Sequence, residues 1–188
     1  PVEHFLSDEY IQGRRSLINP AKAADRVEPA REATQSDTIY LAVADQHGNM
    51  VSLINSVYDY FGSGIVVPGY GVLLNNEVTD FDFAGPPPNV PEAGKRPRSS
   101  MAPTIALKDG KPAFSVGSPG GATIITTVLQ TIVNYVDFGM PMHQALDAPR
   151  ISQRNAPDTS VEPGFAGSAQ ATALARFGQR WESPPEEI

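Results

Sequence analysis

The sequence predicts an α+β fold in which β-hairpins and helices occupy separate stretches of the chain. Two pairs of β-rich runs, each joined by a turn of polar residues and glycine, indicate antiparallel hairpins. A longer stretch with helical spacing of its apolar residues follows the second pair and indicates an amphipathic helix. Because the strands cluster instead of alternating with helices, a layered α+β domain is favoured over a series of βαβ units.

Composition limits the possible function. The 188 residues are enough for one hydrophobic core, and 40% hydrophobic with 19% charged residues is typical of globular proteins. A net charge of -7 argues against a nucleic-acid surface, and no apolar run is long enough for a membrane span. The chain has no cysteine, which excludes disulfides and thiolate metal sites within it. With only 3 histidines, which are widely scattered, a histidine-based zinc site or a Ser-His-Asp triad is disfavoured.

The first part of the chain differs in character from the rest. Residues 1–37 are polar and charged, with a helical pattern that opens at Asp8. Residues 26–36 show no apolar period, which indicates an exposed loop or linker. The pattern changes at Thr38. An exposed loop that ends at a threonine is expected of a processing site, and it is equally expected of any loop that leads into a strand.

Strands are predicted from residue 39 onward. Residues 39–44 and 50–56 flank a polar turn and indicate the first hairpin. Residues 71–76 indicate a short buried strand that runs into polar residues. Residues 104–107 and 113–116 indicate a second hairpin around an Asp-Gly turn.

The later part of the chain is predicted to be helical. Apolar residues recur with helical spacing from Ile124 to Val136, which indicates an amphipathic helix. Gly139 is predicted to end this helix, and Pro141 to begin a second one that runs to about Ala148. A last helix is predicted within residues 168–179.

Several residues have types suited to catalysis or binding, although each also has an ordinary structural explanation. Thr38 could be a latent nucleophile or simply a hydroxyl at the start of a strand. Gly120 and Gly121 precede the amphipathic helix, where backbone N–H groups can stabilise an oxyanion; the alternative is a plain glycine turn.

Two further pairs suit the recognition of charged groups. Ser99 and Ser100 lie between prolines, and rigid hydroxyls there suit a carboxylate, although a cap or turn would look the same. Glu77 and Asp80 follow the predicted strand at residues 71–76 and suit a cationic amine, although acidic pairs in loops are usually only solvated.

Taken in this order, these residues resemble the C-terminal part of γ-glutamyltranspeptidases (glutathione hydrolases), which are N-terminal-nucleophile hydrolases. The resemblance runs from about Thr38 to about Pro163. It is densest in three separated blocks, namely residues 73–77 with Asp80-Phe81, residues 96–101, and residues 117–121 with 124–130.

The resemblance implies a role for each candidate residue. Thr38 is expected to be the nucleophile that heads the small subunit after self-cleavage between Asp37 and Thr38, with Ser56 hydrogen-bonded to it. The other expected roles are the α-amino site (Glu77, Asp80), the α-carboxylate site (Ser99, Ser100) and the oxyanion hole (Gly120, Gly121).

The resemblance also implies an overall organisation. The fold is expected to be a four-layer αββα sandwich, with residues 1–37 as the end of the large subunit and the processing linker. Residues 38–188 are expected to be the small catalytic subunit, stopping short of the closing strands. The expected partner is the large subunit of the same precursor, and a homo-oligomer of such heterodimers is left open.

The implied activity is cleavage of γ-glutamyl amides, such as glutathione-like donors, through a γ-glutamyl-threonine acyl-enzyme. Water or an amine then accepts the acyl group, and no metal or organic cofactor is expected. The resemblance favours a bacterial periplasmic or secreted location and leaves the cytoplasm open.

One position departs from the family pattern. Tyr58 lies where γ-glutamyltranspeptidases usually have an asparagine that contacts the donor, and a bulky phenol there could reshape the pocket. An amidase for oxamate or glutaryl-cephalosporin donors is therefore an alternative. A further alternative is an unprocessed, non-catalytic relative, because residues 1–37 stand in the same chain as Thr38.

Overall fold

A computed structural model describes residues 7–15, 19–22, 37–85, 88–186 and 188. The predicted exposed loop at residues 26–36 lies outside these ranges. Helix α2 (Asp8–Arg15) begins where the sequence predicted, with Asp8 and Glu9 in its first turn. Acidic side chains there are favourable, because the unpaired N–H groups of a helix N-terminus carry partial positive charge.

The first predicted hairpin is confirmed. Strand β1 (Asp37–Ala44) pairs antiparallel with β2 (Met50–Tyr58). The turn between them is closed by the Asp45 carboxylate, whose Oδ1 accepts from the N–H groups of His47 and Asn49, both at 2.9 Å. The Asn49 side chain also donates to Asp45 Oδ2, at 2.7 Å, and this bond together with the backbone bonds holds the pKa of Asp45 below its ordinary value, since they stabilise the charged form.

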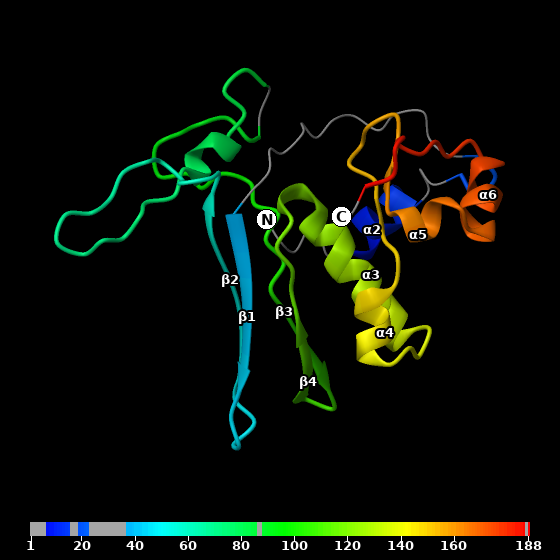
Figure 1. The fold of residues 1–188 in the computed structure, drawn as a ribbon, viewed down its shortest axis with the longest axis horizontal. Helices are drawn as coiled ribbons and strands as arrows, with labels where there is room; N and C mark the ends of the chain where they lie inside the picture. Colours follow the sequence, from blue (N-terminus) through cyan, green and yellow to red (C-terminus); the bar gives the residue numbers. More distant parts are fainter. Residues whose placement is uncertain (1–6, 16–18, 23–36, 86–87, 187) are drawn as a thin grey trace.

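The second hairpin and the long helix are also confirmed. Strand β3 (Thr104–Lys108) pairs with β4 (Lys111–Val116) around Asp109 and Gly110, which both have positive φ. This conformation suits a two-residue hairpin turn. Helix α3 (Ile124–Val136) lies alongside this hairpin, and the β1–β2 hairpin lies on the other side (Figure 1).

The two hairpins and α3 share one hydrophobic core. Its buried members are Ile54 of β2, Val116 of β4, and Ile124 and Val128 of α3. Tyr40 of β1 packs against this group. Strands and a helix that bury their apolar sides against each other give the α+β class expected from the sequence.

The chain after α3, here called the C-terminal unit, packs against α3 through α4 and β5 (Figure 1). Gly139 has positive φ after α3, as expected of a residue that ends a helix, and Ser168 caps the last helix by accepting from Ala171 N–H at 3.0 Å. The elements of this part are α4 (Met142–Asp147), β5 (Ile151–Ser152), β6 (Ser160–Val161), α5 (Pro163–Ala166) and α6 (Ala169–Ala175).

The predicted buried strand at residues 71–76 is wrong. Only Leu73 makes a β-bridge there, to Val66, and Val72 and Leu74 are exposed. The apolar run instead belongs to a loop that turns back on itself, since Val67 N–H donates to the Val72 carbonyl. A short apolar run does not by itself distinguish a core strand from a loop.

One face of the first hairpin stays in water. Alternate residues of a strand point to opposite faces, so Thr38 and Tyr40 point toward one side and their neighbours toward the other. That other face carries large apolar side chains that are roughly half exposed (Ile39, Leu41, Val43, Val51, Leu53). We refer to these five residues as the outer face of the hairpin.

Among the described residues, no helix has the length and apolar character needed to cross a membrane.

A carboxylate with several donors holds the C-terminal unit together. Glu162 is buried and accepts from Arg150 N–H at 2.7 Å, from Arg150 Nε at 2.9 Å and from Arg150 Nη2 at 2.7 Å. It also accepts from Ile188 N–H at 3.1 Å. Burial acts to raise the pKa of Glu162, but these bonds and the Arg150 charge outweigh it, and the pKa lies below its ordinary value.

We expect Glu162→Gln to destabilise the protein by about 2–4 kcal/mol, because it removes the charge and turns one acceptor into a donor facing Arg150. Urea unfolding measures the effect. Asp158→Asn, which breaks the exposed Arg180–Asp158 pair, serves as the matched control and should cost less than about 1 kcal/mol.

The stabilisation by Glu162 should depend on pH in a defined direction. Because the folded pKa is depressed, the contribution of Glu162 is present above the ordinary value of 4.5 and is lost as pH falls through the folded pKa. If the difference in unfolding free energy between wild type and Glu162→Gln stayed constant down to these acidic pH values, Glu162 would not be the stabilising carboxylate.

Candidate active site

The register of the first hairpin places two hydroxyls side by side. Thr38 is paired with Ser56 across the strands, and Thr38 Oγ1 lies 3.0 Å from Ser56 Oγ. The register shifts between Asp37 and Thr38, because Asp37 is opposite Tyr58 and Val57 has no counterpart on β1. The peptide bond predicted to be cleaved therefore lies at a β-bulge, an irregularity that is common beside active sites.

Ser56 is held by a second contact. Its Oγ accepts from the backbone N–H of Tyr58 at 2.9 Å. A hydroxyl has one proton to donate and two lone pairs, so accepting from Tyr58 N–H is compatible with a further contact to Thr38. Ser56 can therefore either donate to Thr38 Oγ1 or accept from it. The sequence-based expectation that these two residues contact each other matches this geometry.

Tyr58 ends β2 in an unusual conformation. Its φ is 77°, in the left-handed region that a residue with a Cβ seldom adopts. Such backbone costs on the order of 1–3 kcal/mol and persists where surrounding contacts hold it. Here the holding contacts are the bond from Tyr58 N–H to Ser56 and a bond from the Tyr58 hydroxyl to Asp80 Oδ1 at 3.1 Å.

The Tyr58 phenol is kept neutral by its surroundings. Burial and the negative charge of Asp80 raise the pKa of Tyr58 to about 12. The hydroxyl therefore remains a proton donor over the whole physiological pH range. It points its proton at the carboxylate that the sequence predicted to hold an ammonium group.

The two predicted acidic residues lie on one short 3-10 helix, η1 (Glu77–Asp80). With about three residues per turn, the first and fourth positions share a face. Asp80 is buried, and burial together with its charge raises the pKa of Glu77 above the ordinary value. Glu77 and Asp80 therefore form a partly buried pair, in which the charge of Asp80 influences Glu77.

Asn76 fixes this turn against the end of β2. Its Oδ1 accepts from Asp59 N–H at 3.1 Å, and its Nδ2 donates to Asp59 Oδ2 at 2.8 Å. The Asn76 N–H donates to the Val57 carbonyl at 3.2 Å. These three bonds tie the acidic turn to the strand that carries Ser56, so the two parts of the site keep a fixed spacing.

Sequence reasoning missed Arg98. Its Nε donates to Asp80 Oδ1 at 3.3 Å, and its backbone N–H donates to Asn89 Oδ1 at 3.0 Å. Asn89 in turn donates from Nδ2 to the Asp80 carbonyl at 2.7 Å. The only signal in the sequence was a basic residue directly before the two predicted serines.

These contacts place the segment predicted to bind the donor carboxylate beside the acidic turn. Ser99 and Ser100 follow Arg98 directly, so the Arg98–Asp80 pair brings their segment beside η1. Ser99 Oγ accepts from Met101 N–H at 3.3 Å, which closes a local turn. This bond leaves the Ser99 hydroxyl proton available as a donor.

The glycine-rich segment approaches the hairpin through Tyr40. A Cβ added at Gly117 would lie 2.4 Å from the Tyr40 ring, so only glycine permits this packing. Tyr40 is two residues beyond Thr38 on the same strand face. Its hydroxyl contacts Ser52 Oγ at 3.0 Å and also Ser115 Oγ of β4. The segment that leads to Gly120 is thereby anchored to the strand of Thr38.

Gly120 and Gly121 form the entry to α3. Both have positive φ, at 134° and 55°, and Gly121 begins the 3-10 turn η2 (Gly121–Thr123) that leads into the helix. The Gly120 carbonyl accepts from the N–H and the hydroxyl of Thr123, at 3.1 and 2.8 Å. The carbonyl thus points into the turn, and a conformation reserved for glycine sets the direction of the N–H groups.

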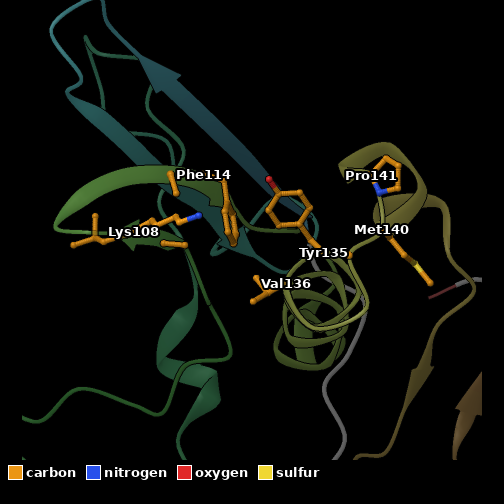
Figure 2. A pocket seen from close by; sticks show the side chains of 10 residues that line it. Lys108, Phe114, Tyr135, Val136, Met140 and Pro141 are labelled. Atoms are coloured by element: carbon orange, nitrogen blue, oxygen red, sulfur yellow. The ribbon is translucent and has the colours of Figure 1, made fainter.

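A separate apolar groove lies at the other end of α3 (Figure 2). It is lined by the tip of the β3–β4 hairpin and by Tyr135, Val136, Met140 and Pro141. The Phe114 and Tyr135 rings meet edge to face there, with centroids 5.0 Å apart. Val136 lies twelve positions after Ile124, a rise of about 18 Å along the helix, so the groove is not part of the site around Thr38.

The arrangement is suited to acyl transfer. It combines a hydroxyl at a chain position where cleavage would free an amine, a second hydroxyl in contact with it, and an acidic pair on a fixed turn. In the part of the chain that the structure describes, no group of three or more histidine, aspartate or glutamate side chains is placed to hold a metal ion.

Comparisons with known proteins agree with the resemblance. The family model described as Gamma-glutamyltranspeptidase matches residues 1–188. The glutathione hydrolase proenzyme of Bacillus subtilis subsp. natto is 39% identical over 206 residues, covering 100% of this chain and 35% of that protein. The chain therefore spans about a third of the length of the curated relatives that it matches.

Solved structures agree as well. The chain is similar to Helicobacter pylori gamma-glutamyltranspeptidase, with a TM-score of 0.70 and 39% identity, covering 79% of this chain and 86% of that one. It is also similar to a cephalosporin acylase from Bacillus halodurans, with a TM-score of 0.83 and 36% identity, covering 99% of this chain and 33% of that one. These neighbours are N-terminal-nucleophile hydrolases, which confirms the predicted fold class. The chain belongs to the gamma-glutamyltranspeptidase family.

Proposed function

We propose that this chain carries the nucleophile of a self-processing γ-glutamyl hydrolase and transferase. The observation that carries the proposal is the 3.0 Å contact between Thr38 Oγ1 and Ser56 Oγ at the start of β1. The relatives named glutathione hydrolase proenzyme support it, since a proenzyme is a precursor that must be cut. Residues 1–37 would then end the large subunit, and residues 38–188 would belong to the small one.

The processing step uses the hydroxyl of Thr38. Its Oγ attacks the carbonyl carbon of Asp37, the bond from that carbon to the Thr38 nitrogen breaks, and an ester and a free amine result. Water then hydrolyses the ester, which leaves a carboxylate on Asp37 and an N-terminal threonine. The bulge at this bond supports the step, because it takes the scissile bond out of the regular ladder.

In turnover the freed amine acts as the base. A threonine hydroxyl is a weak nucleophile near neutral pH and needs a neighbouring base. The α-amino group has an unperturbed pKa of roughly 7.7–8.0, so it can accept the hydroxyl proton near working pH. Oγ attacks the γ-carbonyl carbon of the donor, and the leaving amine departs with the proton. Water or an acceptor amine then takes the acyl group from Thr38.

The neighbouring residues are proposed to bind and stabilise. Ser56 holds Thr38 Oγ1, and the N–H groups of Gly120 and Gly121 stabilise the tetrahedral oxyanion. On this proposal the donor is held through its α-amino and α-carboxylate groups. The residues assigned to these two groups are Glu77 and Asp80, and Ser99 and Ser100, respectively.

A second candidate is an amidase for another small acyl group, of the oxamate or glutaryl-cephalosporin type. It is favoured by the Tyr58 phenol on Asp80 and by the similarity to a cephalosporin acylase along nearly the whole chain. The third reading, a non-catalytic relative, requires that the chain stays uncut between Asp37 and Thr38.

We expect Thr38→Ala, made in the complete protein, to leave the precursor uncut and to lower hydrolysis of γ-glutamyl p-nitroanilide by on the order of 10³-fold or more. Intact mass and N-terminal sequencing follow the cleavage. Thr172→Ala, on the exposed side of α6, is the matched control and should be cut normally. A Thr38→Ala protein that is still cut before residue 38 would contradict the nucleophile assignment.

Ser56→Ala should lower kcat by about tenfold with little change in KM, because the lost hydrogen bond acts on the attacking oxygen and not on the bound donor. Ser56→Thr keeps the hydroxyl and should retain most of the activity. Steady-state kinetics on the processed enzyme distinguish the two. Equal loss in both variants would mean that the Ser56 side chain matters only for packing.

The KM for γ-glutamyl p-nitroanilide should rise as pH falls, since a protonated Glu77 no longer attracts the donor ammonium. Burial and the charge of Asp80 raise the pKa of Glu77, so the rise should begin at a higher pH than the ordinary value of 4.5 allows. Glu77→Gln should raise KM at neutral pH about tenfold and remove this part of the profile. An identical pH profile in the variant would show that another group is responsible.

A further inference from the structure

The contact between Arg98 and Asp80 lies within the candidate site and has no role in the proposed reaction. Asp80 Oδ1 receives two donors, the Tyr58 hydroxyl at 3.1 Å and Arg98 Nε at 3.3 Å. The Asp80 side chain is 11% exposed and that of Arg98 is 42% exposed. The largely buried Asp80 carboxylate therefore already has a cationic partner, and that partner is partly exposed to solvent.

The Arg98–Asp80 pair lowers the net negative charge of the proposed donor site. A buried Asp80 without a cation would favour an ammonium group on the donor, because an unpaired buried charge is costly. With Arg98 on Asp80, one of the two negative charges is neutralised before any donor binds. An acyl group without an ammonium then leaves no uncompensated charge on Asp80.

Glu77 is the remaining carboxylate of the pair. Burial and the nearby charge of Asp80 raise its pKa, so Glu77 takes up a proton more readily than an ordinary glutamate. A protonated Glu77 needs no ammonium partner. Glu77 is also only partly buried, so water can solvate its carboxylate when the donor brings no ammonium group.

We propose that Arg98 is a specificity residue of the donor site, which neutralises Asp80 and lets the site accept glutaryl-type acyl groups alongside γ-glutamyl groups. The inference rests on the proposed function, because it concerns the donor site of that reaction. Arg98 acts through Asp80 and is thus a positioning residue. The terminal carboxylate that both donors share would use Ser99 and Ser100 in either case.

Two probes isolate this effect. γ-Glutamyl p-nitroanilide and glutaryl p-nitroanilide differ only in the ammonium group, so the ratio of their kcat/KM values reports on recognition of that group alone. The measurements use the complete protein chain that contains residues 1–188. The variants are Arg98→Gln, which removes the charge and keeps a donor, and Arg98→Lys, which keeps the charge. Arg180→Gln removes an exposed arginine from a remote pair and is the control.

Arg98→Gln should lower the glutaryl to γ-glutamyl ratio by about five- to tenfold, mainly through KM. Arg98→Lys should stay within about twofold of wild type, and Arg180→Gln should not change the ratio. Melting temperatures check that each variant is folded. If Arg98→Gln does not fold, Arg98→Met, which keeps the aliphatic stem, takes its place.

An unchanged ratio in Arg98→Gln, or an equal fall in Arg98→Lys and Arg98→Gln, would overturn the proposal. Calorimetric binding of glutarate and of L-glutamate gives a readout without turnover. If wild type hydrolysed neither anilide while Arg98→Gln still shifted the relative affinities toward L-glutamate, the proposed function would fail and the role of Arg98 would stand. If the anilides were hydrolysed and neither readout shifted, only the role of Arg98 would fail.

Discussion

The site depends on the register of one strand pair. Thr38 meets Ser56 because β1 and β2 are aligned so that these two residues face each other on the inner side of the hairpin. A slip by one residue would turn Thr38 to the outer face. Tyr40 opposes such a slip, since its hydroxyl contacts one serine on β2 and one on β4 and its ring fits against Gly117.

The second part of the site is built from loops and is held by side chains rather than by a ladder. Asn76 clamps the acidic turn to the end of β2, and Asn89 ties the segment before the two serines to the Asp80 carbonyl. The strained backbone of Tyr58 belongs to the same arrangement, because it directs the phenol at Asp80. A rigid strand pair thus carries the hydroxyls, while a cross-linked loop region carries the charges.

Sequence reasoning found what local patterns encode. The two hairpins and α3 were predictable because turn residues and helical spacing repeat within a few positions, and the hydroxyl pair followed from the family resemblance. Residues 71–76 were mispredicted because an apolar run carries no information on whether anything covers it. The Arg98–Asp80 and Arg150–Glu162 pairs were missed, since each joins residues more than ten positions apart that no local period links.

The outer face of the first hairpin has a consequence for how the site comes into being. Its five apolar side chains remain in contact with water in this chain, and a two-stranded hairpin alone is only marginally stable. In this chain the strand of Thr38 is stabilised on its inner face alone, by the core that Ile54 forms with Val116, Ile124 and Val128. A surface packed on the outer face would stabilise the same strand pair that sets the Thr38–Ser56 contact, so its binding would be coupled to the geometry of the proposed nucleophile.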